Sequence, residues 1–327
     1  MQPREYSMDS NHEILEVLDG FDVPILFLIF NRLDTSKLIL ESIRKVRPLK
    51  LYVACDGSRG DREGEREKVE AVREYVLKSI DWDCEVKTLF RKENLGCGKA
   101  VSGAITWFFE NEEKGIILED DCLPSASFFT YCKELLWKYK NEPKIFHIAG
   151  NNPLTCTKTK YSYYFARIEH CWGWATWRRA WEKYTLDIND LDDFISQKKI
   201  SKIFTRNIDK DYWVKIFREV EKHEIDSWAY SWTYAIFNND GICINPAKNL
   251  ITNIGFGAEA THTIDCNSVF HNQQRFEIEE IIHHEKIVIN KRIINQINKV
   301  AFNLYLFSFL KKRIKRILKS ILRLGRV

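Results

Sequence analysis

The chain has 327 residues, 45% of them hydrophobic and 29% charged, which is typical of a globular protein and excludes disordered, collagen-like and disulfide-scaffold chains. The formal net charge of +4 is unevenly spread, because 11 of the 50 basic residues and no acidic residue fall within 291–327. The rest of the chain is mildly acidic. This pattern argues against a nucleic-acid groove and indicates an anionic surface as the partner of the basic segment.

Cysteine usage and the N-terminal residues indicate the compartment. Nine cysteines are scattered without a CxxC pair, which predicts a reducing environment and no zinc knuckle. The first 24 residues carry seven charged side chains and no apolar segment, so we expect no secretory signal. No apolar run approaches the 18 residues of a spanning helix. We therefore expect a cytoplasmic protein.

From Val23 onward, short apolar runs alternate with helical periods. This alternation predicts an α/β fold, with a Rossmann-like, mostly parallel sheet and helices on both faces. We expect strands at 24–30, 51–55, 85–90 and 115–118, and helices at 35–46, 62–78 and 99–110.

Beyond a strand at 145–148 the sequence becomes rich in aromatic residues, and we expect a helix-rich half. Its segments are 161–165, 172–184, 211–223 and 226–238, followed by a strand at 241–245. No linker or repeat separates the halves. We therefore predict one domain over 21–285, with halves at 21–122 and 123–285.

An acidic triplet, Glu119-Asp120-Asp121, directly follows the fourth expected strand. Ligands of open α/β sheets bind outside the carboxyl ends of the strands. Adjacent carboxylates repel one another unless a cation or hydrogen-bond donors compensate, so the triplet indicates a metal site. A solvated turn that caps the helix expected near Ser125 is the alternative.

The glycine-rich segment 93–103 matches neither common phosphate-binding motif. Val101 stands where the dinucleotide fingerprint needs its third glycine, and Ala100 stands where a P-loop needs Ser or Thr. We therefore interpret the segment as a helix N-terminus, at which Lys99 forms an anion site less specific than either motif. A plain strand-to-helix turn is the alternative.

Several segments together resemble GT-A fold glycosyltransferases, specifically the bacterial family-2-like group with N-acetylglucosaminyltransferase-I-like motifs. The resemblance covers 23 to about 265, and its most specific part is the acidic motif followed by Pro124 and two phenylalanines. The matching segments are 30–32, 54–57, 94–103, 117–124, 172–181 and 253–262.

The resemblance implies a nucleotide-sugar transferase fold in which 21–122 binds the nucleotide and 123–285 the acceptor. It implies that Asp56 receives the uracil N3 hydrogen and that Arg32 lies against the nucleotide. Asp120 would serve the ribose, and Asp121 would be the direct ligand of Mn²⁺ or Mg²⁺. Glu119 would face the sugar.

Other positions in the matching segments receive roles by the same resemblance. Asn31 and Asn94 would contact the nucleotide-sugar, and His262 would approach the metal or diphosphate unless it is a surface residue. Trp172 to Trp174, Gly173 included, are expected near the donor sugar. Trp174, Trp177 and Trp181 recur at helical spacing, which more often indicates core, so the last two are expected in the interior.

An inverting transfer needs a carboxylate that deprotonates the acceptor hydroxyl. Asp226 is the candidate, because it lies near the position of the family's base and precedes Trp228 and Trp232, which could form a sugar platform. A helix N-cap is the alternative role for Asp226. Glu169, in the loop before Trp172, is the second candidate base.

The basic C-terminal segment has an apolar stripe with helical spacing. Surrounded by Lys and Arg, this stripe predicts an interfacial helix within 291–327 that binds an anionic membrane through 300–324. Because the stripe has no use on a phosphate backbone, we expect no nucleic-acid partner; a dimerising helix stays possible. The stripe consists of Leu310, Ile314, Ile317, Leu318 and Ile321.

The sequence thus predicts a metal-dependent inverting glycosyltransferase in surface polysaccharide biosynthesis. Its donor would be a nucleotide-sugar, expected to be UDP-linked, its acceptor a glycan or a lipid-linked glycan, and its location the inner face of the cell membrane. A sugar-1-phosphate nucleotidyltransferase is the alternative enzyme, although the glycine-rich basic loop it needs after the first strand is absent at 31–34. A non-enzymatic protein that binds or perturbs membranes through the basic segment is the third reading.

Overall fold

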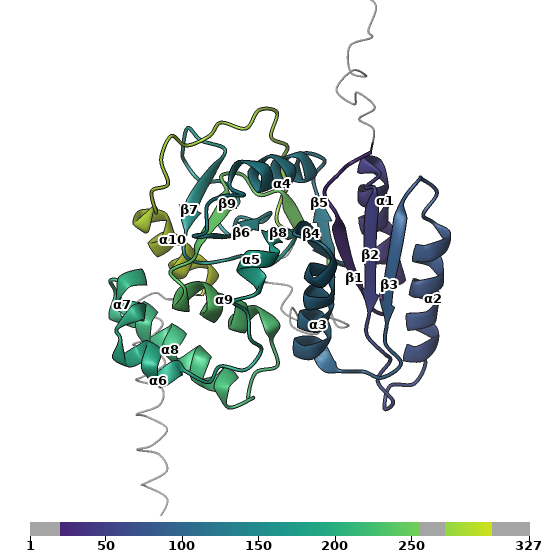
Figure 1. The fold of residues 1–327 in the computed structure, drawn as a ribbon, viewed down its shortest axis with the longest axis horizontal. Helices are drawn as coiled ribbons and strands as arrows, with labels where there is room; N and C mark the ends of the chain where they lie inside the picture. The colour runs from purple at the N-terminus through teal and green to yellow at the C-terminus, as the bar shows by residue number, and fades with distance from the viewer. Residues whose placement is uncertain (1–19, 256–271, 303–327) are drawn as a thin grey trace, which may run out of the picture.

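The structure, a computed structural model, describes residues 20–255 and 272–302 (Figure 1). An eight-stranded sheet runs through the described part in the order β3-β2-β1-β4-β8-β6-β9-β7, and β10 pairs with β5 in a small second sheet. The strands are β1 Ile25–Ile29, β2 Lys50–Cys55, β3 Glu85–Phe90, β4 Lys114–Glu119, β5 Cys122–Pro124, β6 Ile145–Ala149, β7 Tyr163–Ala166, β8 Trp174–Trp177, β9 Ile242–Pro246 and β10 Ile251–Asn253.

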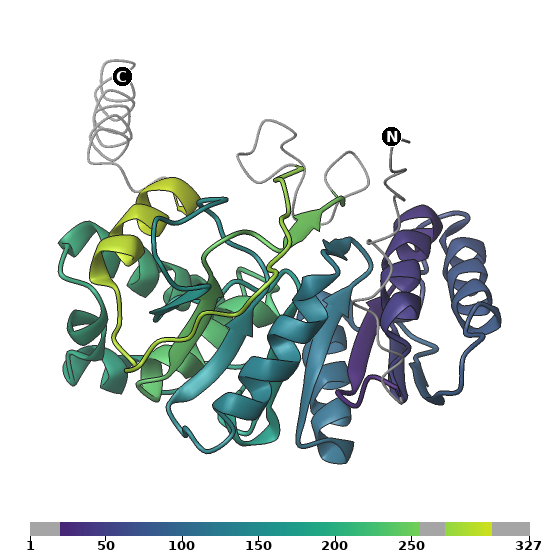
Figure 2. The same cartoon turned by 90° about the horizontal axis from the view of Figure 1, so that it is seen from above.

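Helices cover both faces of the large sheet (Figure 2). β1 to β4 are mutually parallel where they pair, and β8 lies antiparallel between β4 and β6. The predicted α/β fold class is confirmed. The helices are α1 Leu33–Val46, α2 Glu65–Lys78, α3 Gly96–Asn111, α4 Ser127–Lys138, α5 Arg178–Trp181, α6 Leu191–Ser196, α7 Lys199–Ile203, α8 Asn207–Glu221, α9 Trp228–Asn238 and α10 Lys291–Ala301.

The two faces of the sheet contact two separate hydrophobic cores. All five residues of β1 are buried, as a strand covered by helices on both sides requires. Ile25, Phe27 and Ile29 belong to the core under α1, α2 and α4, whereas Leu26 and Leu28 belong to the core under α3 and α9. This alternation follows from the two-residue period of a strand.

Part of the tryptophan-rich segment forms a strand, although the helical spacing of its tryptophans predicts a helix. Trp174 and Trp177 belong to β8 and lie in opposite cores, while α5 is a single turn that ends at Trp181. The expected segment 161–165 likewise becomes the strand β7. The prediction of a helix-rich half is therefore wrong at these two places, because a fully buried strand and a buried helix share the same apolar pattern. Burial of Trp177 and Trp181 is confirmed.

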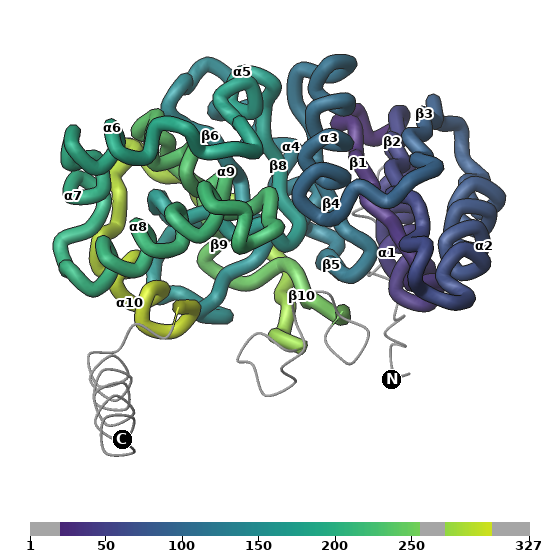
Figure 3. The backbone as a smooth tube through the Cα atoms, turned by 90° about the horizontal axis from the view of Figure 1, so that it is seen from below, coloured from purple at the N-terminus to yellow at the C-terminus, as the bar shows by residue number. Residues whose placement is uncertain are grey.

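Helix α3 lies between the first half of the sheet and α9 of the second half (Figure 3). It begins at Gly96, three residues before the expected start, so the glycine-rich segment is its first turn. The carboxyl ends of β1 to β4 lie beside this turn, which places all of them around one cavity.

The first eleven residues of the basic segment form α10, which packs on the body of the protein. The side chain of Asn290 accepts a hydrogen bond from the Ile293 N–H at 3.1 Å and caps the helix. Ile293, Ile294 and Ile297 are buried in the core beside α9. No helix within residues 20–255 and 272–302 is long and apolar enough to cross a membrane. The stripe beyond Leu310 lies outside the described residues.

Candidate active site

A cavity of about 430 Å³ opens at the carboxyl ends of β1, β2, β3 and β4. It collects carboxylates and guanidinium groups from segments that are far apart in the sequence, which is the usual place and composition of a ligand site in an open α/β sheet. Eight residues predicted from the sequence line it: Arg32, Asp56, Asn94, Glu119, Asp120, Asp121, Trp172 and Asp226.

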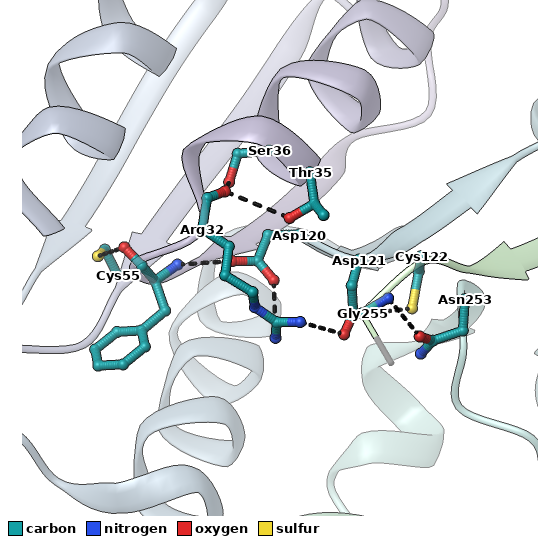
Figure 4. A network of polar contacts seen from close by, with 10 residues as sticks. Arg32, Thr35, Ser36, Cys55, Asp120, Asp121, Cys122, Asn253 and Gly255 are labelled. Atoms are coloured by element: carbon teal, nitrogen blue, oxygen red, sulfur yellow. Dashed lines mark hydrogen bonds and ion pairs between the residues drawn. The ribbon is translucent and has the colours of Figure 1, made fainter. Parts of the chain in front are cut away.

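The acidic triplet at the end of β4 is compensated by one guanidinium group. Arg32 Nη1 lies 2.9 Å from Asp121 Oδ2, and Arg32 Nη2 lies 3.3 Å from Asp120 Oδ1 (Figure 4). The other Asp120 oxygen accepts a hydrogen bond from the Phe30 N–H at 3.2 Å. The triplet therefore faces the cavity instead of forming the solvated turn of the alternative reading.

Burial makes these carboxylates hard to ionise together. It raises the pKa of both Glu119 and Asp120 above their usual range, and the neighbouring carboxylates raise the two pKa values further. The Arg32 charge acts in the opposite direction on both. A group of buried carboxylates that share the charge of Arg32 favours binding of a further cation.

The next cavity wall is built from the ends of β2 and β3. Both carboxylate oxygens of Asp56 accept hydrogen bonds from the Leu95 N–H, at 2.9 and 3.2 Å. Burial raises the pKa of Asp56, while the Leu95 N–H lowers it. Arg73 Nη2 donates to the carbonyl oxygens of Asp56 and Arg91, at 2.9 and 2.7 Å, and thereby holds the two strand ends together. Asp56 is thus rigidly placed.

Asp226 reaches the cavity from the second half of the chain. Its Oδ1 accepts a hydrogen bond from the Gly98 N–H at 2.9 Å, in the first turn of α3. The residue before α9 is Ser227, and no side-chain hydrogen bond caps that helix. The N-cap alternative is therefore wrong for Asp226, which contacts a different helix and remains exposed to the cavity.

Glu169, the second candidate base, lies in the core instead. Its side chain is buried, and Oε1 accepts a hydrogen bond from Thr233 Oγ1 at 2.5 Å. Burial raises the pKa of Glu169 to about 7. It does not line the cavity, so a cavity-bound ligand meets Asp226 and not Glu169.

Four predicted donor-site residues lie away from the cavity lining. Trp174 is fully buried and stacks on Trp228, with ring centroids 5.6 Å apart. Asn31 donates a hydrogen bond to Glu65 at 3.0 Å. Lys99 is exposed, and Gly173 is buried beside Ile251. Trp174 and Gly173 were expected to contact the sugar, but both are packed in the core, because β8 begins at Trp174 and is an inner strand of the sheet.

One predicted metal-site residue, His262, lies outside the described residues. In the described ranges no group of three or more His, Cys, Asp or Glu side chains is arranged to hold a metal by itself. Asp121 is the carboxylate closest to Arg32 Nη1 and lines the cavity. Carboxylate oxygens are the ligands that Mg²⁺ and Mn²⁺ prefer, so the donor set fits such an ion when a bound ligand completes the coordination.

The cavity also contains residues to which the sequence gave no role. Arg91 directly follows β3, so the strand-end argument that selected Asp56 applied to it as well. Asn253 ends β10, and its Oδ1 accepts from the Gly255 N–H at 2.9 Å beside Asp121 (Figure 4). Asn253 opens the matching segment 253–262 but received no role there, because its place at the cavity depends on the pairing of β10 with β5. Lining residues without a predicted role include Phe30, Arg59, Arg91, Cys97 and Asn253.

The chain is similar to known proteins in its three-dimensional structure but not in its sequence. No protein family and no curated protein sequence matches the chain. A mannosyltransferase from Pyrobaculum calidifontis, in complex with GDP-Man and Mn²⁺, is 16% identical with a TM-score of 0.36, and the match covers 50% of this chain and 48% of that one. A UDP-glucose pyrophosphorylase complexed with UDP-glucose is 9% identical with a TM-score of 0.35, over 71% of this chain and 93% of that one.

A third similar structure is 4-diphosphocytidyl-2C-methyl-D-erythritol synthase from Anaerococcus prevotii, 11% identical with a TM-score of 0.32, covering 54% of this chain and 83% of that one. This chain spans about half the length of the mannosyltransferase. Overlaps of this size assign no activity.

Proposed function

We propose that the chain is a metal-dependent inverting glycosyltransferase that uses a UDP-sugar. One observation carries the proposal. A single cavity is lined both by polar side chains that follow β1 to β4, which suit a nucleoside diphosphate, and by the Asp226 carboxylate from the other half of the chain. A donor-binding wall and a separate carboxylate are the two parts that a direct displacement at the anomeric carbon requires.

The donor end of the cavity offers complementary groups. The held carboxylate of Asp56 accepts the imide hydrogen of uracil, and the guanidinium of Arg91 donates to a carbonyl oxygen of the base. Asp120 accepts hydrogen bonds from the ribose in this proposal. Arg32 contributes positive charge on the phosphate side, because it already lies against Asp120 and Asp121. Each group thereby meets a part of the donor of opposite polarity.

A divalent ion would be held by Asp121 together with the diphosphate oxygens of the donor. When bound there, Mn²⁺ or Mg²⁺ would offset the negative charge of the leaving diphosphate. Asp121 Oδ2 already pairs with the Arg32 guanidinium at 2.9 Å, which supports this position as one that accepts a cationic partner.

Asp226 is the base of the proposed reaction. Its carboxylate takes the proton of an acceptor hydroxyl as that oxygen bonds to the anomeric carbon. The bond between the anomeric carbon and the phosphate oxygen breaks, and UDP leaves with the bonding electron pair. Attack from the side opposite the phosphate inverts the anomeric configuration. Trp172, at the cavity wall, is the aromatic surface for the sugar ring.

A sugar-1-phosphate nucleotidyltransferase would use the same fold for a different reaction, in which the sugar 1-phosphate attacks the α-phosphorus of UTP and pyrophosphate leaves. It would need a long glycine-rich loop for the triphosphate after β1, but α1 begins at Leu33, four residues after the end of β1 at Ile29. We therefore favour sugar transfer.

Two parallel assays decide between these reactions. The first measures UDP released from a UDP-sugar with Mn²⁺ and simple glycosides as acceptors. The second measures pyrophosphate released from UTP and a sugar 1-phosphate. We expect activity in the first assay, whereas pyrophosphate release without UDP release would contradict the proposal.

The basic segment extends the proposal to a membrane-bound acceptor. Residues 303–327 contain eight Lys and Arg and no acidic residue. Each basic residue near an anionic leaflet contributes about 1 kcal/mol of binding free energy. A chain held at the inner face of the cell membrane would meet lipid-linked glycans, the acceptors of surface polysaccharide biosynthesis.

The membrane proposal predicts a difference between two forms of the chain. The full-length protein is expected to co-sediment with vesicles that contain phosphatidylserine, and a form ending at Phe302 is expected to stay in solution. Cutting after Phe302 retains α10, whose buried isoleucines would be lost by a cut after Asn290. Binding should weaken as salt is raised, because the attraction is screened. Equal binding of both forms would refute the anchor.

A further inference from the structure

The carboxylate of Asp226 is seated in the first turn of α3, 128 residues earlier in the chain. Its Oδ1 accepts the Gly98 N–H at 2.9 Å. Within the described residues, no hydrogen-bond donor contacts the other oxygen, Oδ2. The carboxylate thus has one oxygen that is fixed and one that is available to a ligand in the cavity.

The carboxylate can lie against this turn only because Gly96 and Gly98 lack side chains. A Cβ at position 98 would overlap Asp226 Oδ1, and a Cβ at position 96 would lie 3.0 Å from Oδ2. A side chain at 96 would therefore crowd the free oxygen, and a side chain at 98 would displace the held one. The Leu186 side chain also lies 3.6 Å from the Cβ position at 98.

Glycine at position 98 is not required by the backbone. Gly96 has a φ of +79°, which favours glycine, but Gly98 lies inside α3 without a positive φ. Alanine stabilises a helix interior relative to glycine, so local helix formation alone favours alanine at 98. The close approach of Asp226 is the contact that explains the glycine.

We infer that Gly98 is a positioning residue for sugar transfer. Its N–H fixes Asp226 Oδ1 and its missing side chain admits the carboxylate, so that Oδ2 faces the acceptor hydroxyl. The inference rests on the proposed function, in which Asp226 is the base. It adds that the geometry of the base is set by the nucleotide-binding half of the chain, across the junction of α3 with α9.

The contact itself is tested without substrate by a double-mutant cycle on thermal stability. The proteins are wild type, Gly98→Ala, Asp226→Ala and the double variant. We expect Gly98→Ala to raise Tm in the Asp226→Ala background, where nothing obstructs the new methyl group, and to lower it in the wild type. The two shifts should differ by at least about 2 °C. Equal Tm shifts in both backgrounds would refute the close contact between Gly98 and Asp226.

The catalytic part is tested with UDP release from the UDP-sugar that the wild type turns over fastest among UDP-glucose, UDP-galactose and UDP-N-acetylglucosamine. Gly98→Ala is expected to lower kcat about 100-fold, because a displacement of about 1 Å costs this much in oriented catalysis, and to leave the Mn²⁺-dependent Tm increase by UDP unchanged. In the Asp226→Asn background the same change should have no further effect.

The outcomes separate the two claims. If Asp226→Asn abolishes turnover and Gly98→Ala retains it, the positioning inference fails and the base assignment stands. If Gly98→Ala lowers kcat by the same factor with and without the Asp226 carboxylate, its effect is structural and the inference fails. If Asp226→Asn retains full turnover, the base assignment itself fails.

Discussion

Asp226→Asn is expected to lower the rate of sugar transfer by about 10² to 10⁴-fold, the usual contribution of a general base. The amide keeps the size of the side chain but cannot take the acceptor proton. Affinity for UDP and Mn²⁺ should be retained, because the donor end of the cavity is formed by the ends of β1 to β4. The measurement compares UDP release by the two proteins with their Tm increase in UDP and Mn²⁺.

Glu169→Gln is the matched control for this substitution. It also changes a carboxylate to an amide in the second half of the chain, but at a buried position outside the cavity lining. Transfer should fall far less than in Asp226→Asn. Loss of transfer in Glu169→Gln, with transfer retained in Asp226→Asn, would assign the base to the loop before Trp172. A product with retained anomeric configuration would reject the single-base mechanism for both residues.

Asp121→Asn is expected to abolish the metal-dependent part of UDP binding while the protein stays folded. The substitution removes the carboxylate charge that would bind the ion, whereas Asp56 and Arg91 at the base end of the cavity are unchanged. The measurement is the Tm increase on adding UDP with and without Mn²⁺. In the variant, the two increases should be equal.

An exposed carboxylate provides the control for the loss of charge. Asp61 lies in the loop before α2, is exposed and does not line the cavity. Asp61→Asn should respond to UDP and Mn²⁺ like the wild type. If Asp121→Asn also responds like the wild type, Asp121 is not the metal ligand.

Local pattern was sufficient to predict the first half of the fold. β1 to β4 are short apolar runs bounded by charged or glycine-rich segments, and each lies within one or two residues of its expected position. Because these strands are parallel, the residues that follow them meet at one edge of the sheet. Arg32, Asp56, Asn94 and the acidic triplet could therefore be placed together from the sequence.

The second half depends on contacts between distant segments, which no local pattern encodes. β8 is a strand because it fills the space between β4 and β6, although its tryptophans have helical spacing. Asp226 reaches the cavity through a hydrogen bond with Gly98, and the sequence assigned those two residues to unrelated motifs. Asn253 reaches it through the pairing of β10 with β5.

The central claim is that the cavity binds a UDP-sugar together with a divalent ion. The most direct test measures the Tm of the wild-type chain with UDP, GDP, dTDP or CMP, each with and without Mn²⁺. We predict that UDP and Mn²⁺ together raise Tm more than the sum of their separate effects and more than the other pairs do. No stabilisation by any nucleotide, or an increase by UDP that is the same without Mn²⁺, would contradict the account.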